Sequence, residues 1–157
     1  MAQRDLLCPS AAAEPGVIVL GIRRADGTIG YLPGQLTADA DFVAAVRDRA
    51  STDFRFAAPC ARGGCGHWRA DPPPDSSSPS SDRSSAGPPS GQCSLIGRLR
   101  DVVADQYQAD ELPRCAIRAS CRWFAQDGRD ACRICPVVTR ASGAPASADP
   151  SQEGTPR

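Results

Sequence analysis

The sequence has no lysine and no asparagine, and it contains a single histidine. All 18 basic residues are therefore arginine, and 18 acidic residues bring the formal net charge to zero. A chain without excess positive charge gives no indication of nucleic-acid binding. With His67 alone, a Rieske centre is excluded because it needs two histidine ligands. Dinucleotide-binding, P-loop and zinc-protease motifs are also missing, so no enzyme class is indicated.

Long apolar segments are missing as well. The strongest apolar run, residues 17–22, is much too short to cross a bilayer. No basic stretch followed by an apolar stretch of secretory length is present at the N-terminus, so we expect a cytoplasmic protein without a membrane partner. Thiols stay reduced in that compartment, and cysteine clusters there usually bind metal. A secreted domain stapled by disulfides is an alternative.

Two segments contain no large apolar side chain and are rich in small and polar residues, namely residues 70–91 and 141–157. Such segments cannot bury enough apolar surface to offset the entropy lost on ordering. We therefore predict one small α+β domain over residues 1–140, stabilised by a metal or cluster. Residues 70–91 are then a disordered insertion in that domain, and residues 141–157 are a disordered tail.

Local patterns predict the elements of this domain. The Asp26-Gly27 pair between two short apolar runs indicates a β-hairpin. Thr37 stands where a helix N-cap is expected. The same periodicities predict strands at residues 17–22, 29–32 and 54–56, helices at 38–49 and 94–106, and a short helix followed by loops in the C-terminal cysteine segment.

Eight cysteines are the most informative residues. Four of them share the spacing C-x5-C-x10-C-x2-C near the C-terminus, and Pro136 follows the last: Cys115, Cys121, Cys132 and Cys135. Because proline cannot continue a helix, the last two thiolates are expected on a tight turn. Four thiolates can bind a zinc ion or hold a [2Fe-2S] or [4Fe-4S] cluster, and spacing alone does not separate these.

A second cysteine segment resembles the first. Residues 60–68 and residues 115–123 both read Cys-Ala, an arginine, two small residues, a cysteine and then a tryptophan. Both are followed by a glycine and a further cysteine, which indicates two related half-sites.

The second set has three certain members, Cys60, Cys65 and Cys93, and needs a fourth ligand. Cys8 is favoured, since the eight cysteines then divide into two groups of four. His67 is the alternative and would complete a Cys3His site. If Cys65 and Cys93 share a centre, the insertion between them must leave the domain and return to nearly the same place.

The run Cys121-x10-Cys132-x2-Cys135-Pro136 resembles the C-terminal [2Fe-2S] motif of the ferric-siderophore reductase family, in which two adjacent cysteines precede the same spacings. Ser120 stands where that family has its first cysteine, so the resemblance implies Cys115 as the fourth ligand. The chain is too short to include that family's substrate domain, and a reductase activity is not implied.

We therefore expect an iron–sulfur protein with one cluster on the C-terminal cysteines and a second on the upstream set. Six arginines against two aspartates between residues 112 and 140 would offset the charge of such a centre. The expected role is electron transfer with a partner oxidoreductase, or redox sensing, as an accessory protein and not an enzyme. A structural zinc module that acts as an adaptor or regulator is the other candidate.

Overall fold

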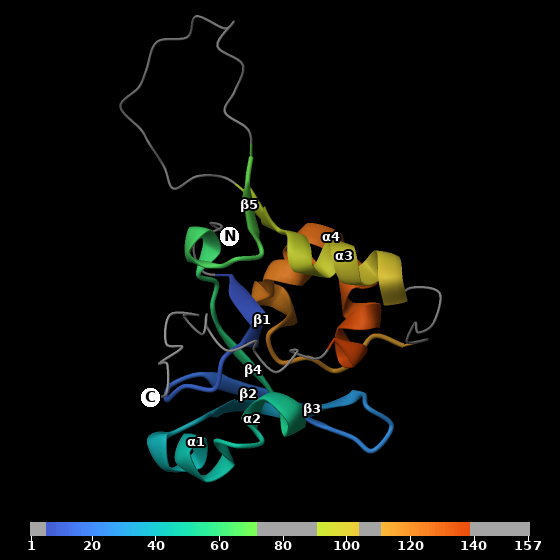
Figure 1. Ribbon diagram of the computed structural model, residues 1–157. Helices are drawn as coiled ribbons and strands as arrows, with labels where there is room; N and C mark the ends of the chain where they lie inside the picture. Colours follow the sequence, from blue (N-terminus) through green and yellow to red (C-terminus); the bar gives the residue numbers. More distant parts are fainter. Residues whose placement is uncertain (1–5, 72–90, 104–110, 139–157) are drawn as a thin grey trace, which may run out of the picture.

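The computed structural model describes residues 6–71, 91–103 and 111–138 of the chain. At its centre lies a four-stranded antiparallel sheet with strand order β1-β4-β2-β3 (Figure 1). The strands are β1 (Leu7–Ala11), β2 (Ile18–Arg23), β3 (Ile29–Thr37) and β4 (Phe54–Pro59). Strands and helices in one small unit confirm the predicted α+β class.

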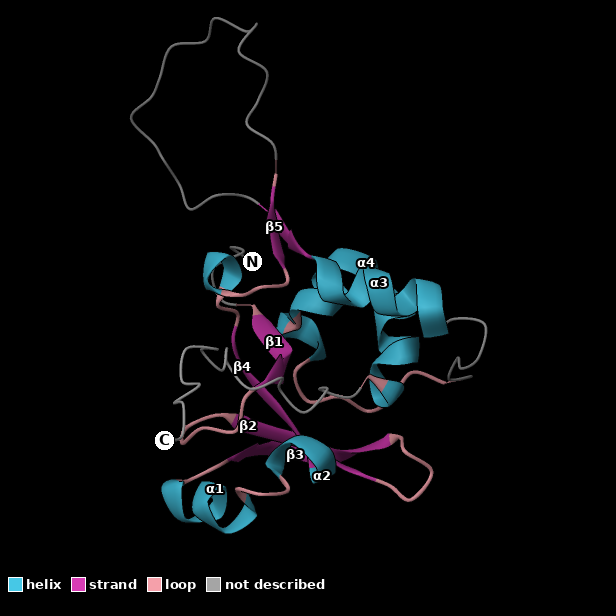
Figure 2. Cartoon of the chain, in the orientation of Figure 1, coloured by secondary structure: helices cyan, strands magenta, loops and turns pink. Residues whose placement is uncertain are grey.

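Helical segments surround the sheet (Figure 2). The helices are α1 (Ala40–Val46), α2 (Ala50–Asp53), α3 (Ser94–Val103) and α4 (Arg122–Ile134). In the described part of the chain, three 3₁₀ turns accompany them, η2 (Arg62–Gly64), η3 (Arg118–Ser120) and η4 (Cys135–Val137). In these described ranges, no helix has the length and apolar character needed to cross a membrane.

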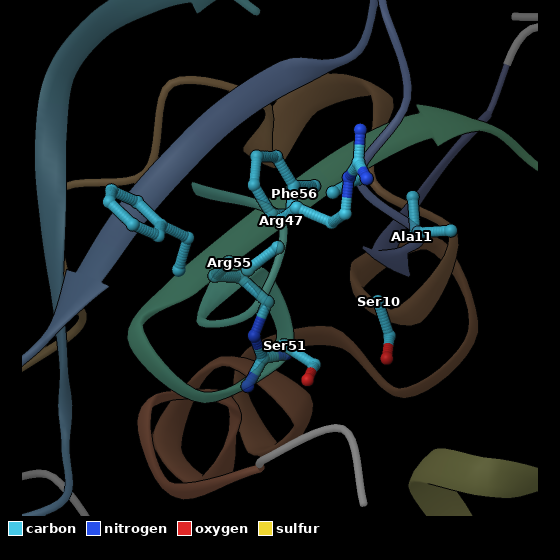
Figure 3. A pocket seen from close by; sticks show the side chains of 10 residues that line it. Ser10, Ala11, Arg47, Ser51, Arg55 and Phe56 are labelled. Carbon is cyan, nitrogen blue, oxygen red and sulfur yellow. The ribbon is translucent and has the colours of Figure 1, made fainter. Parts of the chain in front are cut away.

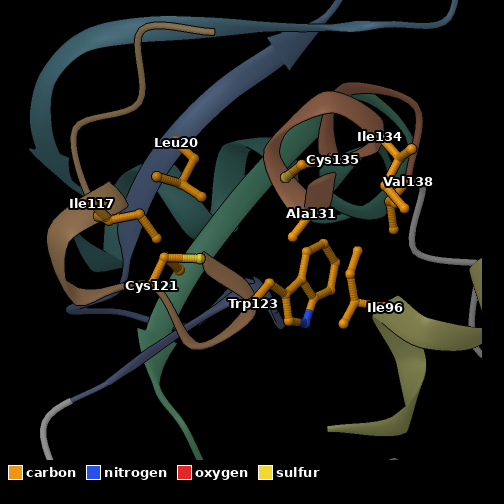
Figure 4. Close-up of a cluster of buried hydrophobic side chains, with 10 residues drawn as sticks. Leu20, Ile96, Ile117, Cys121, Trp123, Ala131, Ile134, Cys135 and Val138 are labelled. Atoms are coloured by element: carbon orange, nitrogen blue, oxygen red, sulfur yellow. The ribbon is translucent and has the colours of Figure 1, made fainter. Parts of the chain in front are cut away.

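Side chains alternate between the two faces of the sheet, and each face has its own apolar core. On β2, Leu20 lies in the core that packs against α3 and α4, where it joins Ile96 and Trp123 (Figure 4). Val19, the preceding residue, lies in the opposite core, where Val46 of α1 packs. The sheet therefore separates two helical layers.

The predicted insertion begins and ends at one small ribbon. Its edges form β5 (Trp68–Ala70) and β6 (Gly91–Cys93), which pair in an antiparallel manner with Ala70 opposite Gly91. This pairing places Cys93 directly opposite Trp68. Most of the insertion and all of the predicted tail, residues 72–90 and 141–157, lie outside the described residues.

The predicted hairpin is confirmed, because β2 and β3 pair on either side of Asp26-Gly27. The Asp26 carboxylate accepts hydrogen bonds from the Thr28 backbone N–H at 2.9 Å and hydroxyl at 2.7 Å. Gly27 has φ of 83°, a conformation that glycine adopts without strain. The turn chemistry therefore fixes the register beside the turn, where Arg23 lies opposite Ile29, and the register shifts beyond Gly21.

Other predicted boundaries change. Thr37 ends β3, so it does not cap the following helix, and Asp39 caps α1 by accepting the Phe42 N–H at 2.7 Å. The cap prediction was wrong because the extended pairing of β3 continues through Thr37. The helix predicted at 94–106 begins at Ser94, and its predicted end lies outside the described residues.

Leu20 and Leu36 provide a matched pair for testing the sheet. Leu20 is 2% exposed between β2 and the α4 layer, whereas Leu36 on β3 is 54% exposed. We expect Leu20→Ala to lower the free energy of unfolding by about 2–5 kcal/mol, because it leaves a cavity. Leu36→Ala should change it by only about 0.5 kcal/mol. Urea denaturation of both variants in reducing buffer measures the difference, and equal losses would contradict the assignment of this core.

Candidate metal centre

The four C-terminal cysteines lie around one pocket. Cys115, Cys121, Cys132 and Cys135 line it, and we call it the downstream pocket. The Cys135 sulfur interacts electrostatically with the sulfurs of Cys115 and Cys132. The Cys121 sulfur interacts in the same way with the sulfurs of Cys135 and Cys115. The free space between the side chains is only about 10 Å³. Three of these cysteines are buried, so the pocket belongs to the core shown in Figure 4.

The helix α4 carries three of these cysteines. Cys121 is its N-cap residue, Cys132 lies in its last turn, and Cys135 is its C-cap residue. The turn expected for the last two cysteines is therefore the end of a helix, which passes into η4 at Pro136. Proline is accepted there because it occupies the first turn of η4, where its missing N–H is not needed.

A kink at Gly128 makes the pocket possible. A straight helix from Cys121 to Cys135 would separate the two residues by about 21 Å. Gly128 has φ of 59° and ψ of −136°, which interrupts α4 and turns its second half. Both ends of the helix can then line the same pocket.

Two polar side chains of the sheet point into this region, and no sequence pattern predicts either. Tyr31 of β3 donates its hydroxyl hydrogen to Sγ of Cys135 at 2.9 Å. Arg55 of β4 is only 4% exposed, and its guanidinium donates to the carbonyl oxygens of Pro9 at 3.2 Å and Cys135 at 3.4 Å. Figure 3 shows Arg55 and Phe56 leaving β4 in different directions. Arg55 alternates with two phenylalanines, a pattern typical of a solvent-facing arginine, yet it is buried.

An arginine other than Arg55 lies in the wall of the downstream pocket. Arg118 of η3 donates a hydrogen bond to the carbonyl oxygen of Pro113 and lines the pocket. Its positive charge lowers the pKa of the Cys132 thiol, although burial has the larger effect and leaves that pKa raised overall. Arg55 acts in the same way on Cys135, together with the Tyr31 hydrogen bond.

Burial keeps these thiols protonated when no cation is bound. It raises the pKa of Cys121 to about 12 and also raises the pKa of Cys115 and Cys135. Burial and the neighbouring Cys135 sulfur raise the pKa of Tyr31, so its hydroxyl remains a donor. Metal binding would replace the thiol protons, because the thiolate is the ligand.

The upstream cysteines also lie around one pocket. Cys8, Cys60, Cys65 and Cys93 line a cavity of about 550 Å³, which we call the upstream pocket. Burial and, to a smaller extent, the proximity of the other three sulfurs together raise the pKa of Cys8 to about 11. All four residues are half-buried, so this pocket is more open to solvent than the downstream one.

His67 also lines the upstream pocket, but one of its ring nitrogens is already engaged. The Arg98 guanidinium lies 2.8 Å from Nδ1 of His67. Arginine can only donate hydrogen bonds, so Nδ1 accepts and the proton of the neutral ring is on Nε2. Cys8 interacts electrostatically with all three other upstream cysteines, and it stays the predicted fourth ligand.

The two predicted half-sites share one local structure. Cys65 follows η2 and its N–H donates to the Arg62 carbonyl at 2.8 Å, while Cys121 follows η3 and its N–H donates to the Arg118 carbonyl at 3.2 Å. Each pocket therefore receives one cysteine from a 3₁₀ turn that begins at an arginine.

All eight cysteines are free thiols. Among the described residues, no three Cys, His, Asp or Glu side chains converge closely enough to form a ready-made shell for a single ion. A third cavity, of about 250 Å³ between β1, β4 and the helices α1 and α2, has no cysteine in its wall (Figure 3). The thiol chemistry is thus concentrated in the upstream and downstream pockets.

No family model, curated protein or solved structure matches the chain.

Gly128 and Gly97 provide a second matched pair. A side chain at either position meets no atom within 4 Å, so only the backbone distinguishes them. Gly128→Ala should lower the free energy of unfolding by about 1–3 kcal/mol, because a residue with a Cβ is strained at its positive φ. Gly97→Ala, inside α3, should raise it by up to about 1 kcal/mol.

Denaturation of the metal-free, reduced proteins measures both effects. Any metal that the downstream pocket holds should be bound less in the Gly128 variant, because the two ends of α4 would no longer line one pocket. Wild-type stability in Gly128→Ala would contradict the kink.

Proposed function

We propose that the protein is an iron–sulfur electron carrier whose cluster is bound by Cys115, Cys121, Cys132 and Cys135. The observation that carries this proposal is that these four cysteines line one buried pocket. Thiolates are the ligands of [2Fe-2S] and [4Fe-4S] clusters, and the spacing around Cys132 and Cys135 resembles a [2Fe-2S] motif. A bound core would spread the four side chains from the positions they hold without it.

The charges around the downstream pocket suit a redox centre. A thiolate-ligated cluster is negatively charged and gains one more negative charge when it is reduced. The buried Arg55 cation and the Tyr31 hydroxyl both lie beside Cys135 and would stabilise that charge. Hydrogen bonds to the sulfurs and nearby charge are among the main determinants of cluster potential. These two side chains therefore support an electron-transfer role over a purely structural metal.

The packing around the downstream pocket argues against catalysis at this centre. Three of its four cysteines are buried, and free space of about 10 Å³ leaves no room for an organic substrate beside a bound core. Electrons can cross such a packed wall, whereas substrates cannot. The role that remains for a shielded one-electron centre is electron exchange with a partner oxidoreductase, or redox sensing.

Metal content and the visible spectrum of anaerobically purified protein test the proposal. We expect iron and inorganic sulfide, with a visible thiolate-to-iron charge-transfer band that bleaches on reduction. Cys132→Ser/Cys135→Ser should lose the iron held by the downstream pocket, while Ser120→Ala, within the same segment, should retain it. Stoichiometric zinc in a colourless protein would overturn the proposal and favour a structural zinc module.

The environment of Cys135 gives a sharper test of the redox role. Tyr31→Phe removes a hydrogen bond to the sulfur, and Arg55→Met removes a buried positive charge. Both variants should lower the reduction potential, because the reduced, more negative state loses stabilisation. Arg47→Met removes an exposed arginine on the α1 side of the sheet and is the control.

Spectroelectrochemical titration of the four proteins measures these shifts. Potentials that move equally in the Arg55 and Arg47 variants would show that the buried charge does not act on the centre.

A further inference from the structure

We propose that Cys8, Cys60, Cys65 and Cys93 bind a second iron–sulfur cluster, and that this cluster passes electrons to the downstream centre through a shared wall. The binding of the second cluster stands on the geometry of the upstream pocket alone. The transfer step rests on the proposed function of the downstream centre.

Four separate elements bring the upstream cysteines together. Cys8 lies on β1, Cys60 directly follows β4, Cys65 follows η2, and Cys93 ends β6. Residues so far apart in the sequence line one cavity of about 550 Å³, which has room for a multi-atom inorganic core. In the described residues the four thiols do not yet lie at ligand distance from a common ion, so a bound core would draw them together across this cavity.

The backbone of the upstream pocket is held in place by hydrogen bonds to other elements. The Cys60 N–H donates to the carbonyl of Leu6 at 2.9 Å. The side-chain amide of Gln126 on α4 makes two hydrogen bonds to the backbone of Cys93. Its Oε1 accepts from the Cys93 N–H at 2.8 Å, and its Nε2 donates to the Cys93 carbonyl oxygen at 3.2 Å. Two of the four ligands are therefore positioned independently of any metal, which lowers the ordering cost of binding.

A buried cation accompanies this pocket too. Arg122 is 3% exposed, lines the upstream pocket, and places its guanidinium 5.1 Å from the centre of the Trp68 ring. Positive charge near the thiols favours their deprotonated form, which binds iron. Arg122 lines the upstream pocket as Arg118 lines the downstream one.

The two pockets share a wall that is one strand thick. Cys8 lines the upstream pocket, and Pro9, the next residue of β1, lines the downstream pocket. Leu7 of β1 forms a bridge with Cys121, a downstream ligand. The Cα atoms of Cys8 and Cys121 are therefore within about 9 Å of each other by chain geometry. Two bound clusters would be near neighbours.

The difference in exposure between the two pockets indicates which cluster an incoming electron reaches first. The upstream cysteines are half-buried around an open cavity, whereas three of the downstream cysteines are buried. One electron from a reduced one-electron carrier would reduce the upstream cluster, and the carrier would be oxidised. That electron would then pass to the downstream cluster, which is reduced as the upstream cluster returns to its oxidised form.

Iron stoichiometry tests the second site. The protein is reconstituted anaerobically with iron and sulfide, and iron per chain is compared in the wild type, Cys8→Ser/Cys60→Ser, and the downstream variant Cys132→Ser/Cys135→Ser. Loss of part of the iron in each variant supports two centres. Full iron in the Cys8/Cys60 variant overturns the second site, whereas full iron in the downstream variant overturns the proposed function and leaves the upstream site intact.

Two further variants guard against a failure to fold. Cys65→Ser removes one ligand in the turn after η2 and should also lose upstream iron. Ala61→Ser, at an exposed position beside Cys60, should keep it. A Cys65 variant with wild-type iron would contradict the ligand set.

Magnetic and kinetic measurements test the transfer step. Electron paramagnetic resonance of the fully reduced wild type should show broadening from two neighbouring spins, which both single-site variants lack. The downstream cluster should be reduced several-fold more slowly by dithionite in the upstream variant than in the wild type. Unbroadened spectra or unchanged rates, with both clusters present, would overturn the shared-wall transfer.

Discussion

The alternation of side chains in the four-stranded sheet is the constraint on which the other features depend. Along β4, Phe54 and Phe56 enter the core beneath α1 and α2, while Arg55 and Ala57 face α4. The same alternation sends Cys8 and Pro9 of β1 to different pockets. The alternation of side chains along the strands therefore produces two cores and places a cation beside Cys135. It also separates the two groups of cysteines.

The buried charge of Arg55 links the fold to the proposed chemistry. In the described part of the chain, its guanidinium contacts two carbonyl oxygens and forms no ion pair with a carboxylate. A buried cation without a compensating anion costs several kcal/mol. Neutral thiols, kept protonated by burial, do not supply that anion. A thiolate-ligated centre does, so cation and ligands would stabilise each other only once the centre is bound.

Much of this organisation could be predicted because it depends on local signals. The hairpin follows from Asp26-Gly27, and the spacing of the cysteines separates the two groups that line the two pockets. Three features were not predictable. Gly128 could have stood in an ordinary helix, since nothing nearby in sequence demands its positive φ. The burial of Arg55 depends on which face of β4 the C-terminal helix covers. Tyr31 forms a hydrogen bond with Cys135, which lies 104 positions later in the sequence. These are long-range contacts without a sequence pattern.

Two centres that each take one cysteine from the same kind of 3₁₀ turn would still differ in reduction potential, because their surroundings differ. Cys121 is 7% exposed, whereas Cys65 lies at an open cavity. Burial in a medium of low dielectric disfavours the extra negative charge of a reduced cluster, so burial alone would make the downstream centre the poorer electron acceptor. Transfer from the open centre to the buried one requires the opposite order. The Tyr31 hydroxyl and the Arg55 guanidinium both act in that direction, which gives these two buried polar groups a common purpose in the proposed electron path.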